Sequence, residues 1–199
     1  MRARQQTWEV HGLRLEGLCW GDESLPPLLA LHGWLDNAAS FEMLAPLLRS
    51  HYVVALDLTG HGRSSRRSED ATYQIWDDLP EVMAVLDQLG WQQFDLIGHS
   101  RGAIISTILA SAIPERINHL VLLDAVMPQA IPEEDFPRQL AKFLQDKPRR
   151  LNREARVYPS AQEAIAARSK MGLSPVAAKA LARRSLVERP DGFVWASDP

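Results

Sequence analysis

One stretch constrains this chain more than any other, namely residues 94–102, which have the sequence FDLIGHSRG. A short apolar run ends there in Gly-x-Ser-x-Gly, and a pattern with helical spacing follows at once. This order predicts a strand, a tight turn and a helix, with Ser100 in a strained backbone conformation at the turn. Gly98 and Gly102 are expected because a Cβ at either position would collide with the neighbouring strand or helix.

Ser100 has two interpretations at this point. It would lie at a helix N-terminus, where free N–H groups and the helix dipole favour negative charge, as a nucleophile at a carbonyl requires. The alternative is an ordinary strand-to-helix turn in which the serine only caps the helix. The apolar run before the turn and the helix after it favour the nucleophile.

The rest of the first half alternates strand and helix patterns. Apolar runs at 28–31, 52–56, 94–97 and 120–123 predict buried strands. Helical patterns at 79–89 and 100–113 lie between them, and Asp78-x-x-Glu81 has the spacing of a capping box. Residues 7–10 and 13–20 predict an antiparallel hairpin. Together these elements predict an α/β fold with a mainly parallel sheet and helices on both faces.

After Val126 the pattern changes. Short helices are predicted over Pro137–Asp146, Ala161–Ser169 and Pro175–Ser185, and Pro190-Asp191-Gly192 predicts a hairpin turn. We therefore expect a core over residues 1–126 and a helical cap over residues 127–199. The charge changes at the same place: residues 1–126 carry 9 Lys and Arg against 16 Asp and Glu, and residues 127–199 carry 13 against 9. Solvated helix faces explain the basic second half more simply than an anionic substrate does.

Composition excludes several classes of protein. A net charge of −3 implies no general affinity for nucleic acid or membrane, and a hydrophobic content of 46% argues against disorder. The single cysteine, Cys19, allows no disulfide framework or cysteine metal cluster, and we expect it to be buried. The N-terminus lacks the apolar core of a signal peptide, and no run is long enough to span a membrane, so a cytoplasmic location is expected. No cofactor is implied, and oligomeric state is not encoded in any pattern found.

Three stretches resemble the α/β-hydrolase superfamily, and in particular its serine hydrolase-like branch. They are LHGWLDNAASF at 31–41, GHGRSS at 60–65 and GHSRG at 98–102. The resemblance covers residues 8–126 well and the later residues more loosely. It implies an α/β-hydrolase sheet flanked by helices, with a helical cap after the sixth strand.

The resemblance also implies roles for particular residues. Ser100 would be the nucleophile, and the backbone N–H groups of Trp34 and Arg101 would form the oxyanion hole. Asp124 is a candidate for the acid of the triad, although some branches place the acid one strand later, and its alternative role is to cap the loop after its strand. His32 is expected to brace the loop that follows the strand at 28–31, here called the oxyanion loop. His99 is expected to point into the fold beneath the turn. The substrate would be an ester, a thioester or a similar small-molecule acyl compound, cleaved through an acyl-enzyme.

The catalytic histidine is where the sequence departs from the family. In this superfamily it follows the serine and the acid, after a late strand. The last of the six histidines is His119, and the 80 residues after it contain none. We therefore expect a C-terminally truncated chain or fragment that lacks the last two strands, exposes an apolar edge at 120–123, and is inactive or nearly so. The rival interpretation is a non-catalytic ligand-binding protein of the same fold.

Overall fold

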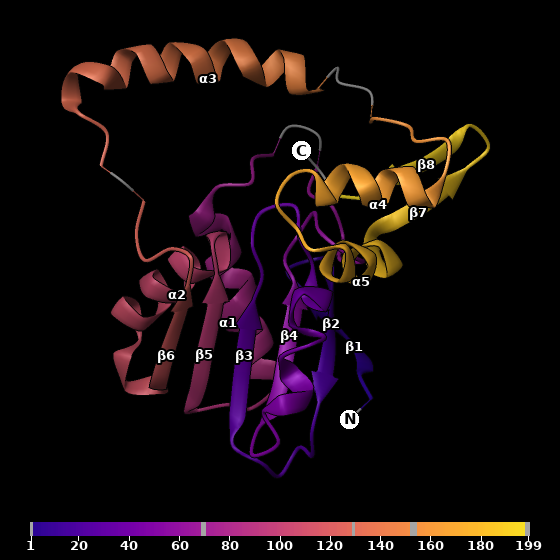
Figure 1. The fold of residues 1–199 in the computed structure, drawn as a ribbon. Coiled ribbons are helices and arrows are strands. Elements are labelled where there is room, and N and C mark those ends of the chain that lie inside the picture. Colours follow the sequence, from indigo (N-terminus) through magenta and orange to yellow (C-terminus); the bar gives the residue numbers. More distant parts are fainter. Residues whose placement is uncertain (1, 69–70, 129, 152–154, 198–199) are drawn as a thin grey trace.

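The structure, a computed structural model, describes residues 2–68, 71–128, 130–151 and 155–197, with only the backbone described at 146–151. Its centre is a six-stranded sheet with the order β1-β2-β4-β3-β5-β6 (Figure 1). The strands are β1 (Arg4–Val10), β2 (Leu13–Trp20), β3 (Pro27–Leu31), β4 (Tyr52–Asp57), β5 (Phe94–His99) and β6 (Ile117–Leu123). Because β4, β3, β5 and β6 pair in parallel, the predicted mainly parallel sheet is confirmed.

The two N-terminal strands form the predicted antiparallel hairpin. Its turn has positive φ at His11 (51°) and at Gly12 (80°), which matches the twist of paired strands. Strand β1 begins at Arg4 rather than at Thr7, because the ladder continues until Arg4 pairs with Cys19. Cys19 is buried, as predicted. Strand β2 also pairs antiparallel with β4 and so joins the hairpin to the parallel strands.

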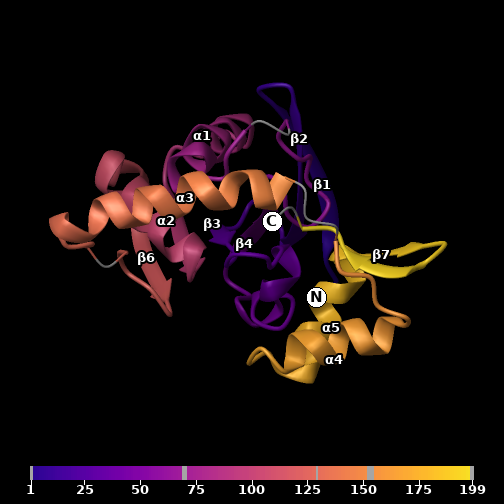
Figure 2. The same cartoon turned by 90° about the horizontal axis from the view of Figure 1, so that it is seen from above.

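Two hydrophobic clusters cover the two faces of the sheet. Helices α1 (Asp78–Gln88) and α2 (Arg101–Ala112) lie on one face, where they bury residues such as Leu96 and Ile105 (Figure 2). On the other face, the 3-10 turns η1 (Ala38–Phe41) and η2 (Ala45–Leu47) contribute Phe41 to a cluster with Ile97. Helices thus cover one face, and short turns cover part of the other.

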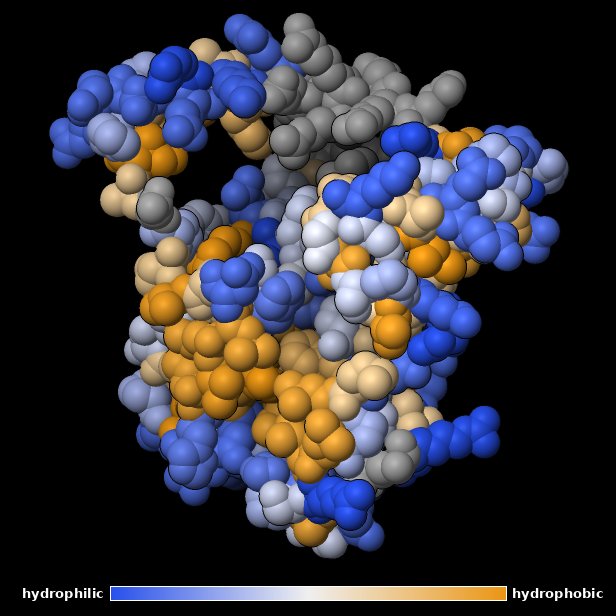
Figure 3. All heavy atoms as spheres, viewed as in Figure 1, coloured by the Kyte–Doolittle hydropathy of each residue, from blue (hydrophilic) through white to orange (hydrophobic). Residues whose placement is uncertain are grey.

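Strand β6 is an open edge of the sheet. Val121 is 48% exposed and Leu123 is 39% exposed. Val121 lies beside Ile97 in the register and therefore on the face turned away from α1 and α2. Figure 3 shows hydrophobic side chains gathered on that face. The apolar edge expected at 120–123 is confirmed, and such an edge favours pairing with another strand.

After β6 the chain forms three helices and a hairpin, as predicted. These are α3 (Phe136–Leu151), α4 (Ala161–Ser169), α5 (Pro175–Ser185), β7 (Leu186–Arg189) and β8 (Gly192–Trp195). Helix α3 runs past the predicted end at Asp146 and stands apart from the sheet (Figure 1). The Ser160 and Ser174 hydroxyls cap α4 and α5 by accepting backbone N–H groups. Among the helices that the structure describes, none has the length and apolar character needed to cross a membrane.

Candidate active site

Ser100 lies in the tight turn between β5 and α2, with φ at 49° and ψ at −113°. This is the strained conformation that the Gly-x-Ser-x-Gly pattern predicts. A Cβ on Gly98 would come within 2.6 Å of the Cα of Ala103, and a Cβ on Gly102 within 2.8 Å of the carbonyl oxygen of His32. Both glycines therefore allow α2 to approach the sheet closely, and the steric expectation is confirmed.

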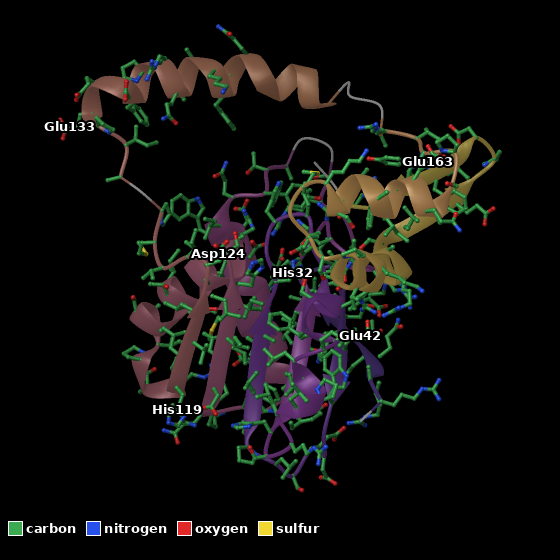
Figure 4. The ribbon with its side chains drawn as sticks, in the orientation of Figure 1. His32, Glu42, His119, Asp124, Glu133 and Glu163 are labelled. Carbon is green, nitrogen blue, oxygen red and sulfur yellow. The ribbon has the colours of Figure 1, made fainter. Side chains whose placement is uncertain are left out.

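The carboxyl end of the sheet brings Ser100 close to the end of β6. The N–H of Ser100 donates to the carbonyl of Leu123, the residue before Asp124, with N and O 2.9 Å apart. Asp124 has φ at 69°, and its side chain is 74% exposed. Figure 4 shows Asp124 and His32 at this end of the sheet and His119 at the opposite end. Asp124 is therefore at the expected edge, but with a solvated carboxylate.

His99 does not lie beneath the turn, contrary to the sequence-based expectation. Its side chain is 37% exposed, with Nδ1 3.8 Å from Oδ2 of Asp36 and Nε2 4.0 Å from Oδ2 of Asp124. The reason is the alternation of β5: His99 follows Ile97 on the sheet face that no long helix covers. The His99 side chain therefore lies between the carboxylates of Asp36 and Asp124 at the carboxyl end of the sheet.

The loop after β3 is braced by His32, as predicted. His32 is fully buried; its Nε2 accepts the N–H of Leu58 at 2.9 Å, and its Nδ1–H donates to the carbonyl of Gly33 at 2.7 Å. Burial lowers the pKa of His32 well below its usual value, so the ring is neutral. Among the described residues, neither the Trp34 N–H nor the Arg101 N–H has a hydrogen-bond acceptor. Both amides are thus free to serve a ligand.

The side chain of Arg101 lies over Trp34 and pairs with Asp78. Its guanidinium lies 4.9 Å from the Trp34 ring centroid and 2.6 Å from Oδ2 of Asp78. Arg101 was considered from sequence only for its backbone N–H, and nothing in the pattern indicated Asp78 as its partner. The contact between Arg101 and Trp34 therefore emerges only in the fold.

The predicted capping box at Asp78-x-x-Glu81 is wrong. The residue before α1 is Asp77, whose side chain makes no cap hydrogen bond, and the capping box lies one turn earlier, at Gln74 and Asp77. Asp78 is occupied by Arg101, and Glu81 pairs with Arg67 at 2.7 Å. Both carboxylates that the local spacing assigned to the helix end therefore form ion pairs with arginines elsewhere in the fold.

Burial raises the pKa of Asp78 to about 6 from 3.8, although the charge of Arg101 opposes the shift. The folded state then takes up a proton between these values, so the contribution of Asp78 to stability falls as the pH rises from about 4 to about 6. Relative to Asp78→Asn, we expect the unfolding free energy to fall by up to roughly 3 kcal/mol across that window. Urea unfolding of both proteins at several pH values measures this difference. If the unfolding free energy of wild type relative to Asp78→Asn rises with pH instead, the charges of the neighbouring arginines lower the pKa of Asp78 more than burial raises it.

Asp57, at the end of β4, organises the loops around the site. It is fully buried and accepts the N–H of Ala38 at 2.7 Å and the N–H of Arg63 at 2.8 Å. It also pairs with Arg184 of α5, whose Nε lies 2.7 Å from Oδ2. Asp57 therefore orders the loops that meet at the end of β4. The ion pair with Arg184 was missed, because 127 residues separate the partners and no local pattern connects them.

No histidine in the described part of the chain hydrogen-bonds the Ser100 hydroxyl. His51 and His119 share Asp95 instead, with N···O distances of 2.9 and 2.8 Å. His32 and His61 are buried and lie against each other with tilted rings, whose centroids are 5.2 Å apart. The described residues also contain no group of His, Cys, Asp and Glu side chains able to hold a metal ion. The site therefore offers a serine and free amides, without a histidine base on the serine.

Comparison with known proteins identifies the class. The sequence profile of the alpha/beta hydrolase fold matches residues 26–161, so the chain belongs to the α/β-hydrolase family. The human serine hydrolase-like protein is 42% identical over 106 residues, which is 53% of this chain and 52% of that protein. This agrees with the branch that the three motifs indicated. The chain spans about half the length of the curated relatives it matches.

Solved structures agree on the fold. A hypothetical protein from Pseudomonas aeruginosa PAO1 superposes with a TM-score of 0.93 and 39% identity, covering 98% of this chain and 70% of that one. The thioesterase domain from the curacin biosynthetic pathway superposes with a TM-score of 0.86 and 27% identity, covering all of this chain and 73% of that domain.

Proposed function

We propose that this chain carries the nucleophile and the oxyanion hole of a serine hydrolase that cleaves an ester, a thioester or a similar carbonyl compound. The observation that supports this most directly is the conformation of Ser100, with φ at 49° between β5 and α2. A serine needs no such strain to cap a helix, since caps ordinarily have extended backbone. The free amides of Trp34 and Arg101 supply the donors that an oxyanion requires. The similarity to a thioesterase domain agrees with an acyl substrate.

The proposed reaction forms an ester between the Ser100 oxygen and the substrate acyl group. Oγ forms a bond to the carbonyl carbon while its proton passes to water. The bond from that carbon to the leaving oxygen or sulfur then breaks, and the leaving group takes up a proton from water and departs as an alcohol or thiol. Water then hydrolyses the acyl-enzyme and restores the serine. Asp124 is the candidate acid on this side of the site, and it would act through a histidine. Among the described residues, no histidine hydrogen-bonds Ser100.

Because no described histidine hydrogen-bonds Ser100, we expect a low rate of acylation. Without a histidine on Ser100, the remaining acceleration comes from binding and the oxyanion hole, on the order of 10³ to 10⁴ over water. We therefore expect slow acylation of Ser100 by reactive acyl or phosphonyl groups and negligible turnover of ordinary esters.

A fluorophosphonate probe tests this proposal. The chain should be labelled slowly at Ser100, as located by peptide mass spectrometry, and Ser100→Ala should lose the label. Ser111→Ala is a matched control, because Ser111 is an exposed serine of the same helix, and it should be labelled at the wild-type rate. Persistent labelling of Ser100→Ala would overturn the nucleophile assignment. Labelling at the rate typical of serine hydrolases with an intact triad would overturn the claim that no described histidine activates Ser100.

A non-catalytic binding protein is the second candidate, and the absence of a base on Ser100 among the described residues favours it. In that case a small acyl compound would bind saturably without turnover. Isothermal titration with such a compound should then give the same affinity for wild-type chain and for Ser100→Ala, and the fluorophosphonate probe should label neither.

A further inference from the structure

The residues that follow Trp34 are held from two sides. On the core side, the N–H of Asp36 donates to the carbonyl of Gly33 with N and O 3.1 Å apart. On the other side, the Arg168 guanidinium of α4 donates to the carbonyl of Leu35 and lies 3.6 Å from Oδ1 of Asp36. Helices that come more than 120 residues later thus contact the oxyanion loop directly.

Leu35 is the residue that most needs such support. Its φ is 61°, a left-handed conformation that branched and bulky side chains avoid. Within the described residues, the side chains that reach its carbonyl come from Arg168 and, at 3.5 Å, from the Ser197 hydroxyl. The hydrogen bond on the core side joins Asp36 to Gly33 and does not involve Leu35 itself. The strained residue is therefore fixed by the late part of the chain.

Arg168 is itself well placed for this task. Its side chain is only 13% exposed, and its guanidinium stacks on the Trp195 ring at 5.0 Å from the centroid. The stacking holds the guanidinium in one position, from which a single nitrogen, Nη2, reaches both the Leu35 carbonyl and the Asp36 carboxylate. Nearby, buried Asn37 donates from Nδ2 to the carbonyl of Leu181 on α5 at 3.1 Å. Two helices thus secure three consecutive residues of the loop.

We infer that Arg168 is a positioning residue of the oxyanion hole, which aims the Trp34 N–H by holding Leu35 in its left-handed conformation. This inference rests on the proposed function, because it assigns Arg168 to the same acylation of Ser100. Arg168 touches neither the nucleophile nor the reacting carbonyl. Its effect passes through one peptide group to the donor, whereas Arg101 contacts the Trp34 ring itself.

The experiment measures fluorophosphonate labelling and amide hydrogen exchange in wild type, Arg168→Met and Arg168→Lys. A donor displaced by about 1 Å can cost about 100-fold, so we expect the maximal labelling rate of Arg168→Met to fall roughly 10- to 100-fold, with the half-saturating probe concentration unchanged. The N–H of Asp36 should exchange about 10-fold faster or more, as for a loop that opens locally. Arg168→Lys should give values between those of wild type and Arg168→Met, because it keeps the charge beside Asp36 but loses the planar group that stacks on Trp195.

A double mutant separates this role from general destabilisation. Leu35→Gly removes the cost of the left-handed conformation, so Arg168→Met should reduce labelling much less, by about 3-fold or less, in that background. Arg183→Gln is the matched control: Arg183 lies on α5 and pairs with Glu42 at 2.7 Å on the exposed side, and its loss should leave labelling and exchange unchanged.

The outcomes are distinguishable. Equal losses from Arg168→Met with and without Leu35→Gly, or unchanged exchange at Asp36, would overturn the inference while leaving Ser100 as the nucleophile. If wild type is not labelled at all, the proposed function fails. In that case, the amide hydrogen exchange of Asp36 in Arg168→Met, compared with wild type, decides alone whether Arg168 holds the loop.

Discussion

Replacing Arg184 by methionine should destabilise the chain by about 3 to 5 kcal/mol, because breaking a buried ion pair leaves an uncompensated charge. Arg184 and Asp57 both have side chains at most 5% exposed. Burial raises the pKa of Asp57, opposed first by Arg184, so the carboxylate depends on this partner for its charge. Urea unfolding near neutral pH measures the loss.

Asp57→Asn in the Arg184→Met background should recover part of that loss, since it removes the orphaned charge. The Arg183→Gln variant on the same helix should cost less than about 1 kcal/mol, because its ion pair with Glu42 is exposed. If Arg184→Met costs no more than Arg183→Gln, the ion pair does not hold α5 to the core. If the double variant is the least stable of all, Asp57 is not carrying an unpaired charge in Arg184→Met.

Replacing Gly102 by alanine should destabilise the chain by about 3 kcal/mol or more, because the new methyl group meets backbone atoms that cannot rotate away. The built Cβ lies 2.5 Å from the carbonyl carbon of Leu31 and 2.8 Å from the carbonyl oxygen of His32. To accommodate it, α2 must move off β3, which displaces Ser100 from the oxyanion loop. We therefore expect a lower thermal midpoint and loss of fluorophosphonate labelling together.

Gly90→Ala is the comparison for this variant. Gly90 has φ at 70° but open space around its Cβ position, so alanine there costs only the left-handed conformation, about 1 to 2 kcal/mol. Labelling at Ser100 should be unaffected by that change. A Gly102→Ala protein as stable as Gly90→Ala would contradict the close approach of α2 to the sheet.

Local patterns were sufficient for most elements of the fold. The strands β2 and β4, the helices α4 and α5 and the turn at Ser100 lie where apolar period, caps and glycines predicted them. These patterns work because each reports a constraint within a few residues. The helix end at Asp78 shows their limit: the spacing was that of a capping box, yet both carboxylates bind arginines that are distant in sequence.

The candidate site divides in the same way. Ser100, its two glycines and the bracing role of His32 follow from sequence, because tight turns and buried polar rings have few alternatives. Sequence does not reveal which arginine meets which group. Arginine is long, and any of the 22 basic residues could have met these groups. The pairs found are Arg101–Asp78, Arg184–Asp57 and Arg168–Leu35. The position of His99 was also mispredicted, since its exposure depends on which sheet face a helix covers.

The sequence by itself determined the family, the parallel sheet, the strained serine and the lack of any histidine after His119. Each of these depends on residue types at short spacing, which the chain fixes before it folds. The tertiary structure alone decided that the helices after β6 help to hold the loop after β3, residues 35–37. That arrangement depends on contacts between residues more than 120 positions apart, which no pattern of short spacing can report.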